Sequence, residues 1–237
     1  MAESFLTALI LLLATLIAST FGFGAGLVAM PPLTLLLGLA TATPLFGLVG
    51  PTIASIILIR HWRLVDFASA WRLILSTLCG IPIGVWLITQ IPSDLMTRCL
   101  GSLLVGYGIF RLGQWPLIRF DTTRWAALFG FIGGILGGAY NTNGPPIVIY
   151  GEMRRWAPRQ FRATLLGYFL PTGVSISLGH AVTGLWTLKV FQLYGLSLPG
   201  ILVAIAIGSR INQQLNTERF QSLLSGLLII LGILLWL

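Results

Sequence analysis

The amino-acid sequence predicts an all-α integral membrane protein with about eight transmembrane helices, arranged as two homologous four-helix halves. Hydrophobic residues make up 56% of the 237 residues and charged residues only 8%, with a mean hydropathy of +0.93. A soluble domain carries about 25% charged residues. Residues 4 to 59 include no Asp, Glu, Lys, Arg or His. One crossing of a bilayer takes about 20 apolar residues, so this run alone is long enough for two crossings.

Runs without charge locate the remaining spans. Two further apolar segments, residues 31–39 and 144–150, are too short to cross a bilayer. We interpret them as re-entrant segments or as continuations of broken helices. The expected spans are residues 5–21, 43–59, 67–89, 95–112, 123–138, 164–183, 189–209 and 220–237.

The two halves of the chain share spaced residues. Trp62, Leu64 and Phe67 recur with the same spacing as Trp186, Leu188 and Phe191. Nearer the start of each half, Gly24 and the Pro31-Pro32 pair correspond to Gly138 and Pro145-Pro146, and an insertion around residues 152–162 reconciles the two alignments. We therefore expect one transmembrane repeat over residues 1–118 and a second over residues 119–237.

The orientation of the two repeats stays open at this stage. Four crossings in each half make the repeats parallel, whereas inverted repeats need an odd number of crossings in each half. The positive-inside rule does not fix the sidedness, because Lys and Arg divide evenly between the two sides of an eight-span arrangement.

The first candidate motif is Gly22-Phe23-Gly24-Ala25-Gly26, followed by Pro31-Pro32. Alternating glycines and two prolines disfavour a continuous helix. In a membrane such a break is tolerated only inside the protein or along a watery cavity. Free N–H groups at the break then attract an anion, with the helix dipole adding to the attraction. The alternative is close helix packing, since Gly22 and Gly26 also form a GxxxG pattern.

The second candidate motif runs from Gly133 to Pro146 and joins glycines to the polar step Asn141-Thr142-Asn143 and then to Gly144 and Pro145. Polar side chains in mid-membrane are costly unless they bind something. Asn amides and a Thr hydroxyl donate to oxyanions without adding fixed charge. The alternative is an ordinary turn at the membrane surface. Together, the two motifs predict a paired site between the halves, with Gly138 preceding the polar step.

The patterns GFGAGLVAMPP in the first half and GGAYNTNGPPIVIYG in the second resemble the TauE/SafE family of membrane exporters. The likeness covers essentially the whole chain. It implies export of sulfite or organosulfonates across a bacterial plasma membrane. The sequence departs from the family pattern at Ala25, Asn141 and Asn143, where the family often has glycine or, at the two Asn positions, serine; these departures bear on the identity of the substrate.

The distribution of charge agrees with an anionic substrate. No carboxylate falls in the middle of an expected span, which disfavours cation transport. The net charge of +8 comes from short arginine clusters beside the spans, and these are typical of topology signals rather than of nucleic-acid binding. Arg98, Arg162 and Arg210 are interpreted as anchors at span ends. Arg72 lies inside the third expected span and is a candidate to attract an oxyanion.

His180 lies deep in an apolar run and is a candidate for proton coupling, because histidine titrates near physiological pH. The alternative is a histidine near the end of its span that only caps it. The two Cys and two His are spread along the chain without metal-ligand spacing. We therefore expect neither a metal site nor a cofactor.

These features predict a secondary transporter of small oxyanions, embedded in the lipid bilayer, with a homo-oligomer as one possible assembly. The sequence contains no GxxxxGK[ST] motif for driving export with ATP. An intramembrane enzyme requires a nucleophile with a base, paired carboxylates or a metal cluster, and the spacing of the residues indicates none. A transporter of another solute or of a cation, and a membrane subunit of a larger complex, remain as alternatives. Flux catalysed by the purified chain across a series of anions and cations distinguishes them.

Overall fold

The computed structural model describes residues 2–59, 62–120, 122–211 and 217–237. These residues form ten α-helices and one 3₁₀-helix, and no strand occurs among them. The elements are α1 (Ala2–Phe21), α2 (Ala25–Leu37), α3 (Leu39–Leu58), η1 (Trp62–Leu64), α4 (Phe67–Gln90), α5 (Ser93–Leu112), α6 (Ala126–Tyr140), α7 (Gly144–Met153), α8 (Pro158–Val182), α9 (Leu188–Ile211) and α10 (Thr217–Leu234).

The all-helical class predicted from the sequence is confirmed, and each of the eight expected spans contains a helix. The number of helices differs from the prediction, because the two short apolar segments form separate helices, α2 and α7. Within the described part of the chain, six helices are long and apolar enough to cross a membrane. These are α1, α3, α4, α5, α8 and α9.

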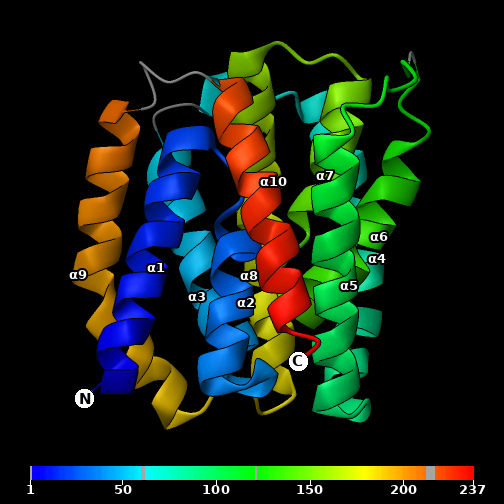
Figure 1. The fold of residues 1–237 in the computed structure, drawn as a ribbon. Coiled ribbons are helices and arrows are strands. Elements are labelled where there is room, and N and C mark those ends of the chain that lie inside the picture. The colour runs from blue at the N-terminus through cyan, green and yellow to red at the C-terminus, as the bar shows by residue number, and fades with distance from the viewer. Residues whose placement is uncertain (1, 60–61, 121, 212–216) are drawn as a thin grey trace.

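The ten helices form a bundle (Figure 1). Two of them, the short helices α2 and α7, each run back toward the end of the bundle where the preceding helix began. Helix α1 rises from the end of the bundle where both termini lie, and α2 returns toward that end. Helices α6 and α7 form a similar hairpin that enters from the opposite end. With 15 residues, α6 is about 22 Å long, which is too short to cross a hydrocarbon core of about 30 Å. We call these pairs the first hairpin (α1–α2) and the second hairpin (α6–α7).

Residues at the tip of each hairpin take a left-handed backbone conformation that ends the first helix. In the first hairpin, Gly22 and Gly24 have φ values of 89° and 94°, which glycine adopts at little cost because it has no Cβ. In the second hairpin, Asn141 has a φ of 52° and is the C-cap of α6. Asn tolerates this conformation better than most residues. The chain thus turns at glycines in the first hairpin and at an asparagine in the second.

Glycines bring α4 and α6 into direct backbone contact. A Cβ placed at Gly134 of α6 would lie 2.9 Å from the Cα of Gly80 and 3.0 Å from the backbone nitrogen of Ile81. Four residues further along, a Cβ at Gly138 would lie 2.8 Å from the backbone nitrogen of Val85. Small residues at every fourth position let two membrane helices approach closely. This seam fixes the position of α6 and therefore of the tip that follows it.

Helices α1 and α9 meet in the same manner. A Cβ at Gly208 of α9 would lie 2.8 Å from the carbonyl oxygen of Leu16 and 2.7 Å from the Cβ of Ser19. A third seam joins α5 to α10, where a Cβ at Gly101 would lie 2.6 Å from the carbonyl oxygen of Gly232. Each hairpin is therefore held by a long helix that packs along its first arm.

The large apolar side chains are distributed as in a membrane protein. Small and medium side chains such as Ala14, Ala42 and Leu45 are fully buried between the helices. Many large apolar side chains face outward instead, among them Leu75, Trp86 and Leu196, each more than half exposed. A soluble protein rarely exposes so much apolar surface. The outer surface of the bundle is suited to contact with lipid.

We predict that Gly134→Leu destabilises the protein by about 1–3 kcal/mol, because the added side chain meets the backbone of α4, which has no room to move. The measurement is the apparent melting temperature of the detergent-purified protein. Gly195→Leu in α9 is the matched control, since a Cβ there has no neighbour within 4 Å. Equal melting temperatures for the two variants would contradict the close α4–α6 contact.

Candidate functional site

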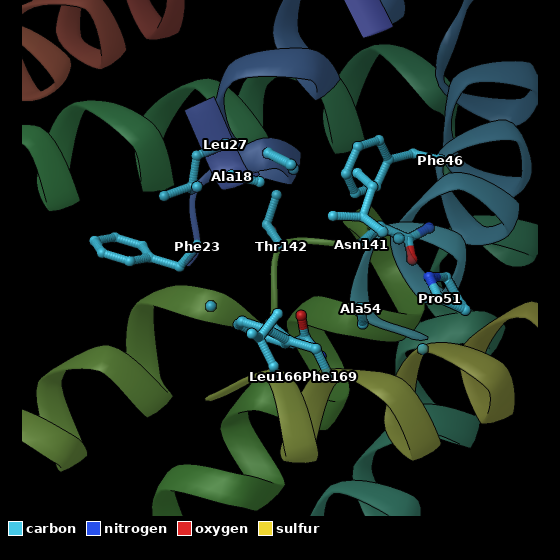
Figure 2. A pocket seen from close by; sticks show the side chains of 18 of the residues that line it. Ala18, Phe23, Leu27, Phe46, Pro51, Ala54, Asn141, Thr142, Leu166 and Phe169 are labelled. Carbon is cyan, nitrogen blue, oxygen red and sulfur yellow. The ribbon is translucent and has the colours of Figure 1, made fainter. Parts of the chain in front are cut away.

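The tips of the two hairpins meet at a cavity of about 80 Å³ in the interior of the bundle. The first hairpin contributes Gly22 to Leu27, and the second contributes Asn141 to Gly144. Helices α3 and α8 form the other walls. Figure 2 shows Thr142 between Leu27 on one side and Leu166 and Phe169 on the other. Segments more than 100 residues apart in the chain thus share one cavity.

The contact between the tips is made by backbone atoms. A Cβ at Gly26 would lie 2.5 Å from the carbonyl oxygen of Asn141. Any side chain at Gly26 therefore forces the two tips apart. The side-chain amide of Asn141 donates a hydrogen bond of 2.6 Å from Nδ2 to the carbonyl oxygen of Thr43 in α3. Asn141 is thus held by α3 on one side and by the first hairpin on the other.

The N-terminus of α2 faces the cavity and offers backbone donors. The first helical hydrogen bond of α2 joins the N–H of Val28 to the carbonyl of Gly24. The N–H groups of Ala25, Gly26 and Leu27 precede that bond, and these three residues line the cavity. A helix leaves its first N–H groups without helical acceptors, and its dipole makes this end partly positive. Such an end is a ready site for an anion.

The N-terminus of α7 also faces the cavity, but it offers fewer backbone donors. Its second and third residues are Pro145 and Pro146, which have no N–H group. Only Gly144 keeps a backbone donor among the first three residues. Side chains of the preceding step supply the remaining donors on this side. The two hairpins thus present different kinds of donor to the same cavity.

Thr142 is the polar side chain of this step that has no partner. Its hydroxyl is buried and makes no hydrogen bond, although the residue lines the cavity. Asn143 makes a long contact of 3.4 Å from Nδ2 to the hydroxyl of Thr172. A buried hydroxyl without a partner costs about 1–3 kcal/mol. Thr142 thus brings a hydroxyl without a partner to the residues that line the cavity.

The rest of the cavity wall is apolar. On α8 the lining residues Leu166, Phe169, Gly173 and Ile176 follow one another at helical spacing along a single face. Facing residues of α3, among them Phe46, complete this wall. Among the residues that the structure describes, none that lines the cavity is charged. The cavity thus combines hydrogen-bond donors at the tips with an apolar surface opposite.

His180 lies next to the second hairpin but outside the cavity wall. Its Nε2 lies 2.9 Å from the carbonyl oxygen of Gly138, the residue three positions before Asn141. A carbonyl only accepts, so Nε2 is the protonated nitrogen in this contact and Nδ1 is left as an acceptor. Nδ1 is buried without a partner, and so is the hydroxyl of Ser177 one turn earlier. Both atoms lie beside Gly47 of α3, together with the side-chain amide of Asn141.

The structure brings seven of the residues named from the sequence to the cavity. These are Gly22, Gly24, Gly26, Asn141, Thr142, Asn143 and Gly144.

The other residues named from the sequence lie outside the cavity wall. Pro31 is buried in the interior of α2, and Pro145 is buried at the start of α7. Gly138 packs against α4. Arg72 is exposed and lies in an outer groove, where its Nη1 donates to the hydroxyl of Thr123, so it is separate from the cavity.

The structure adds residues that the sequence analysis did not select for the site. The apolar wall residues gave no signal, because Leu and Phe occur throughout the chain. Arg162 was interpreted as an anchor, yet its side chain lies against Gly22 at the tip of the first hairpin. Its Nη2 donates a hydrogen bond of 2.6 Å to the carbonyl oxygen of Ser19 in the last turn of α1. Only the packing of α8 against the first hairpin could identify it.

Among the described residues, no group of three or more His, Cys, Asp or Glu side chains is placed to hold a metal ion. The paired charges that the structure describes lie at the ends of the bundle helices. Arg111 at the end of α5 binds Glu152 near the end of α7, with Nη1 2.6 Å from the carboxylate oxygens. This pair fastens the outer end of the second hairpin to the bundle.

Similarity to known proteins identifies the family of this chain. The family model described as "Sulfite exporter TauE/SafE" matches residues 7–235. A protein of Cupriavidus necator described as "Probable sulfite/organosulfonate exporter TauE" is 24% identical over 218 residues, which cover 89% of this chain and 85% of that protein. No solved structure matches. With its apolar helices, the chain is a multi-pass protein of the bacterial inner membrane. The chain belongs to the TauE/SafE family of sulfite exporters.

Proposed function

We propose that this chain is a secondary transporter that exports small oxyanions, sulfite or an organosulfonate-like anion, through the cavity between the two hairpin tips. The observation that carries the proposal is the meeting of two helix N-termini, those of α2 and α7, at one cavity. Both termini bring partly positive dipole ends to the same point. Broken helices that direct their N-termini at an anionic group are a common feature of secondary transporters.

The donors around the cavity suit an oxyanion. The free N–H groups of α2 and the hydroxyl of Thr142 all donate, and the lining contains no carboxylate. A sulfonate or sulfite oxygen accepts several such hydrogen bonds at once. The apolar wall of Phe46, Leu166 and Phe169 is compatible with the short carbon chain of an organosulfonate. The family membership and the name of the Cupriavidus protein support the same class of substrate.

We also propose that residues 1–118 and 119–237 are two repeats of opposite orientation. In each half a hairpin is followed by three α-helices, which are α3, α4 and α5 in the first half and α8, α9 and α10 in the second. Residues 22–24 and 141–143 form the tips at equivalent places. The glycine seam of α4 with α6 has its counterpart in the contact of α9 with α1. The hairpins enter from opposite ends of the bundle (Figure 1), and inverted repeats of this kind support alternating access around a central site.

Energy for export comes from the membrane potential, which drives anions outward, or from coupled proton movement. His180 is the residue that we propose for such coupling. Its Nε2–H donates to Gly138 of the second hairpin, and a second proton would add at Nδ1, making the ring cationic and strengthening that contact. Its Nδ1 lies beside Gly47, together with the hydroxyl of Ser177 and the side-chain amide of Asn141.

We predict that Thr142→Val lowers the apparent affinity for sulfite about tenfold, because it removes a donor to a charged ligand while keeping the shape of the side chain. The measurement is sulfite efflux from proteoliposomes over a range of concentrations, with Asn143→Ala tested alongside. Thr15→Val is the matched control, since the hydroxyl of Thr15 is also buried without a partner but lies outside the cavity wall. Unchanged efflux in both Thr142→Val and Asn143→Ala would exclude the polar step from the site.

We predict that His180→Gln abolishes the response of sulfite flux to an imposed pH gradient but leaves flux driven by membrane potential. Glutamine keeps a side-chain N–H for the carbonyl of Gly138 and does not titrate. The measurement compares the two driving forces in the same proteoliposomes. A pH-gradient response equal to that of the unmodified protein would rule out His180 as the coupling group.

We predict that cysteines introduced by Leu64→Cys and Thr183→Cys react with a membrane-impermeant maleimide from opposite sides of the membrane. Leu64 lies between α3 and α4, and Thr183 lies between α8 and α9, which are the equivalent connections of the two proposed repeats. The native Cys79 and Cys99 are exposed and are first replaced by alanine. Labelling of both positions from the same side would indicate parallel repeats.

A further inference from the structure

We infer that Arg162 is the positive charge that attracts and holds the anion, although it lies beside the cavity rather than in its wall. This inference rests on the proposed function of the cavity and adds to it a residue that determines selectivity for negative charge. It follows from the position of Arg162 on α8, from its contacts with the first hairpin, and from the lack of a compensating carboxylate.

Arg162 stands on the face of α8 that lines the cavity. It precedes Leu166 by four residues and Phe169 by seven, so that all three side chains leave the helix on the same side. Leu166 and Phe169 are wall residues. Arg162 therefore occupies the next position of the same stripe, toward the end of the bundle where α8 begins.

The contacts of Arg162 place its side chain at the tip of the first hairpin. A Cβ at Gly22 would lie 2.6 Å from the Cγ of Arg162, so the missing side chain of Gly22 makes room for the arginine. Gly22 itself lines the cavity. The hydrogen bond from Nη2 to the carbonyl of Ser19 holds the guanidinium against the C-terminal end of α1. Arg162 thus contacts the lining residue Gly22 and lies one helical turn before the lining residue Leu166.

The charge of Arg162 is not balanced by an ion pair in the described structure. Its recorded partner is a neutral carbonyl, and its Nε–H is buried without an acceptor. Arg111 differs, because Glu152 neutralises it. Arg72 and Arg98 differ too, because both are exposed. A partly buried guanidinium without a counterion exerts a stronger field than an exposed one, because less water screens it.

An uncharged donor set next to an unpaired cation suits selective anion transport. The helix N-termini and Thr142 supply short hydrogen bonds, and Arg162 supplies attraction that favours anions over neutral solutes of the same shape. Because the guanidinium lies behind Gly22, the anion is not locked into a bidentate ion pair. Strong bidentate pairing slows release, which a transporter must allow.

The test compares Arg162→Gln, Arg162→Lys and Arg98→Gln in proteoliposomes, with sulfite as the transported anion. Arg162→Gln should raise KM for sulfite about tenfold and reduce the dependence of KM on ionic strength, while the maximal rate changes less. Arg162→Lys keeps the charge and should stay within about threefold of the unmodified protein. Arg98→Gln removes an exposed arginine that lies over the ring of Trp236 and should leave KM unchanged.

An unchanged KM and an unchanged salt dependence in Arg162→Gln would overturn the inference. Equal losses in Arg162→Gln and Arg162→Lys would also overturn it, since they would indicate a structural role. If Arg162→Gln does not yield monodisperse protein, Arg162→Lys is the deciding variant. It keeps the positive charge, so a KM that no longer depends on ionic strength in this variant would contradict a role for charge. The proposed function is judged separately by Thr142→Val. A lower apparent affinity for sulfite in Thr142→Val, together with an unchanged KM in Arg162→Gln, refutes the role of Arg162 and leaves the cavity as the site.

Discussion

A helix that is interrupted inside a membrane must satisfy its free backbone groups within the protein, and the rest of this structure depends on that constraint. The two hairpin tips lie against each other inside the bundle, and the free N–H groups of α2 face the cavity between them. Gly26 lets the carbonyl of Asn141 approach the first turn of α2, and the side chain of Asn141 binds the carbonyl of Thr43. Because lipid offers no hydrogen bonds, neither tip is stable alone at that depth. Their association creates the cavity.

The glycine seams determine where the tips meet. Membrane helices gain little from the hydrophobic effect when they associate, so close packing has to hold them. Gly134 and Gly138 fix α6 against α4, and Gly208 fixes α9 against α1. The ion pair of Arg111 with Glu152 secures the outer end of the second hairpin. The tips are thereby positioned by rigid elements on both sides of the bundle, which is a requirement for a preorganised site.

In the proposed function, the charge around the cavity binds an anion without trapping it. None of the described lining residues is charged, and the attraction that we propose comes from two helix N-termini and from Arg162, which lies against Gly22. A site that must both load and release its solute needs moderate affinity. Dipoles and a displaced cation provide this more readily than a guanidinium in direct contact. Through its contact with Gly138, His180 gives the same tip a titratable neighbour.

Composition, charge-free runs and Gly, Pro and Asn patterns are local properties, so they were enough to predict the membrane class, the positions of the long helices, the two interruptions and the family resemblance. The sequence by itself did not determine that the short segments return as hairpins from opposite ends, because hairpin direction depends on how distant helices pack. For the same reason it could not place two arginines relative to the cavity. Arg72 and Arg162 both lie near the start of a long helix, but only α8 packs against the first hairpin tip. Tertiary packing alone decided which of them stands beside the cavity.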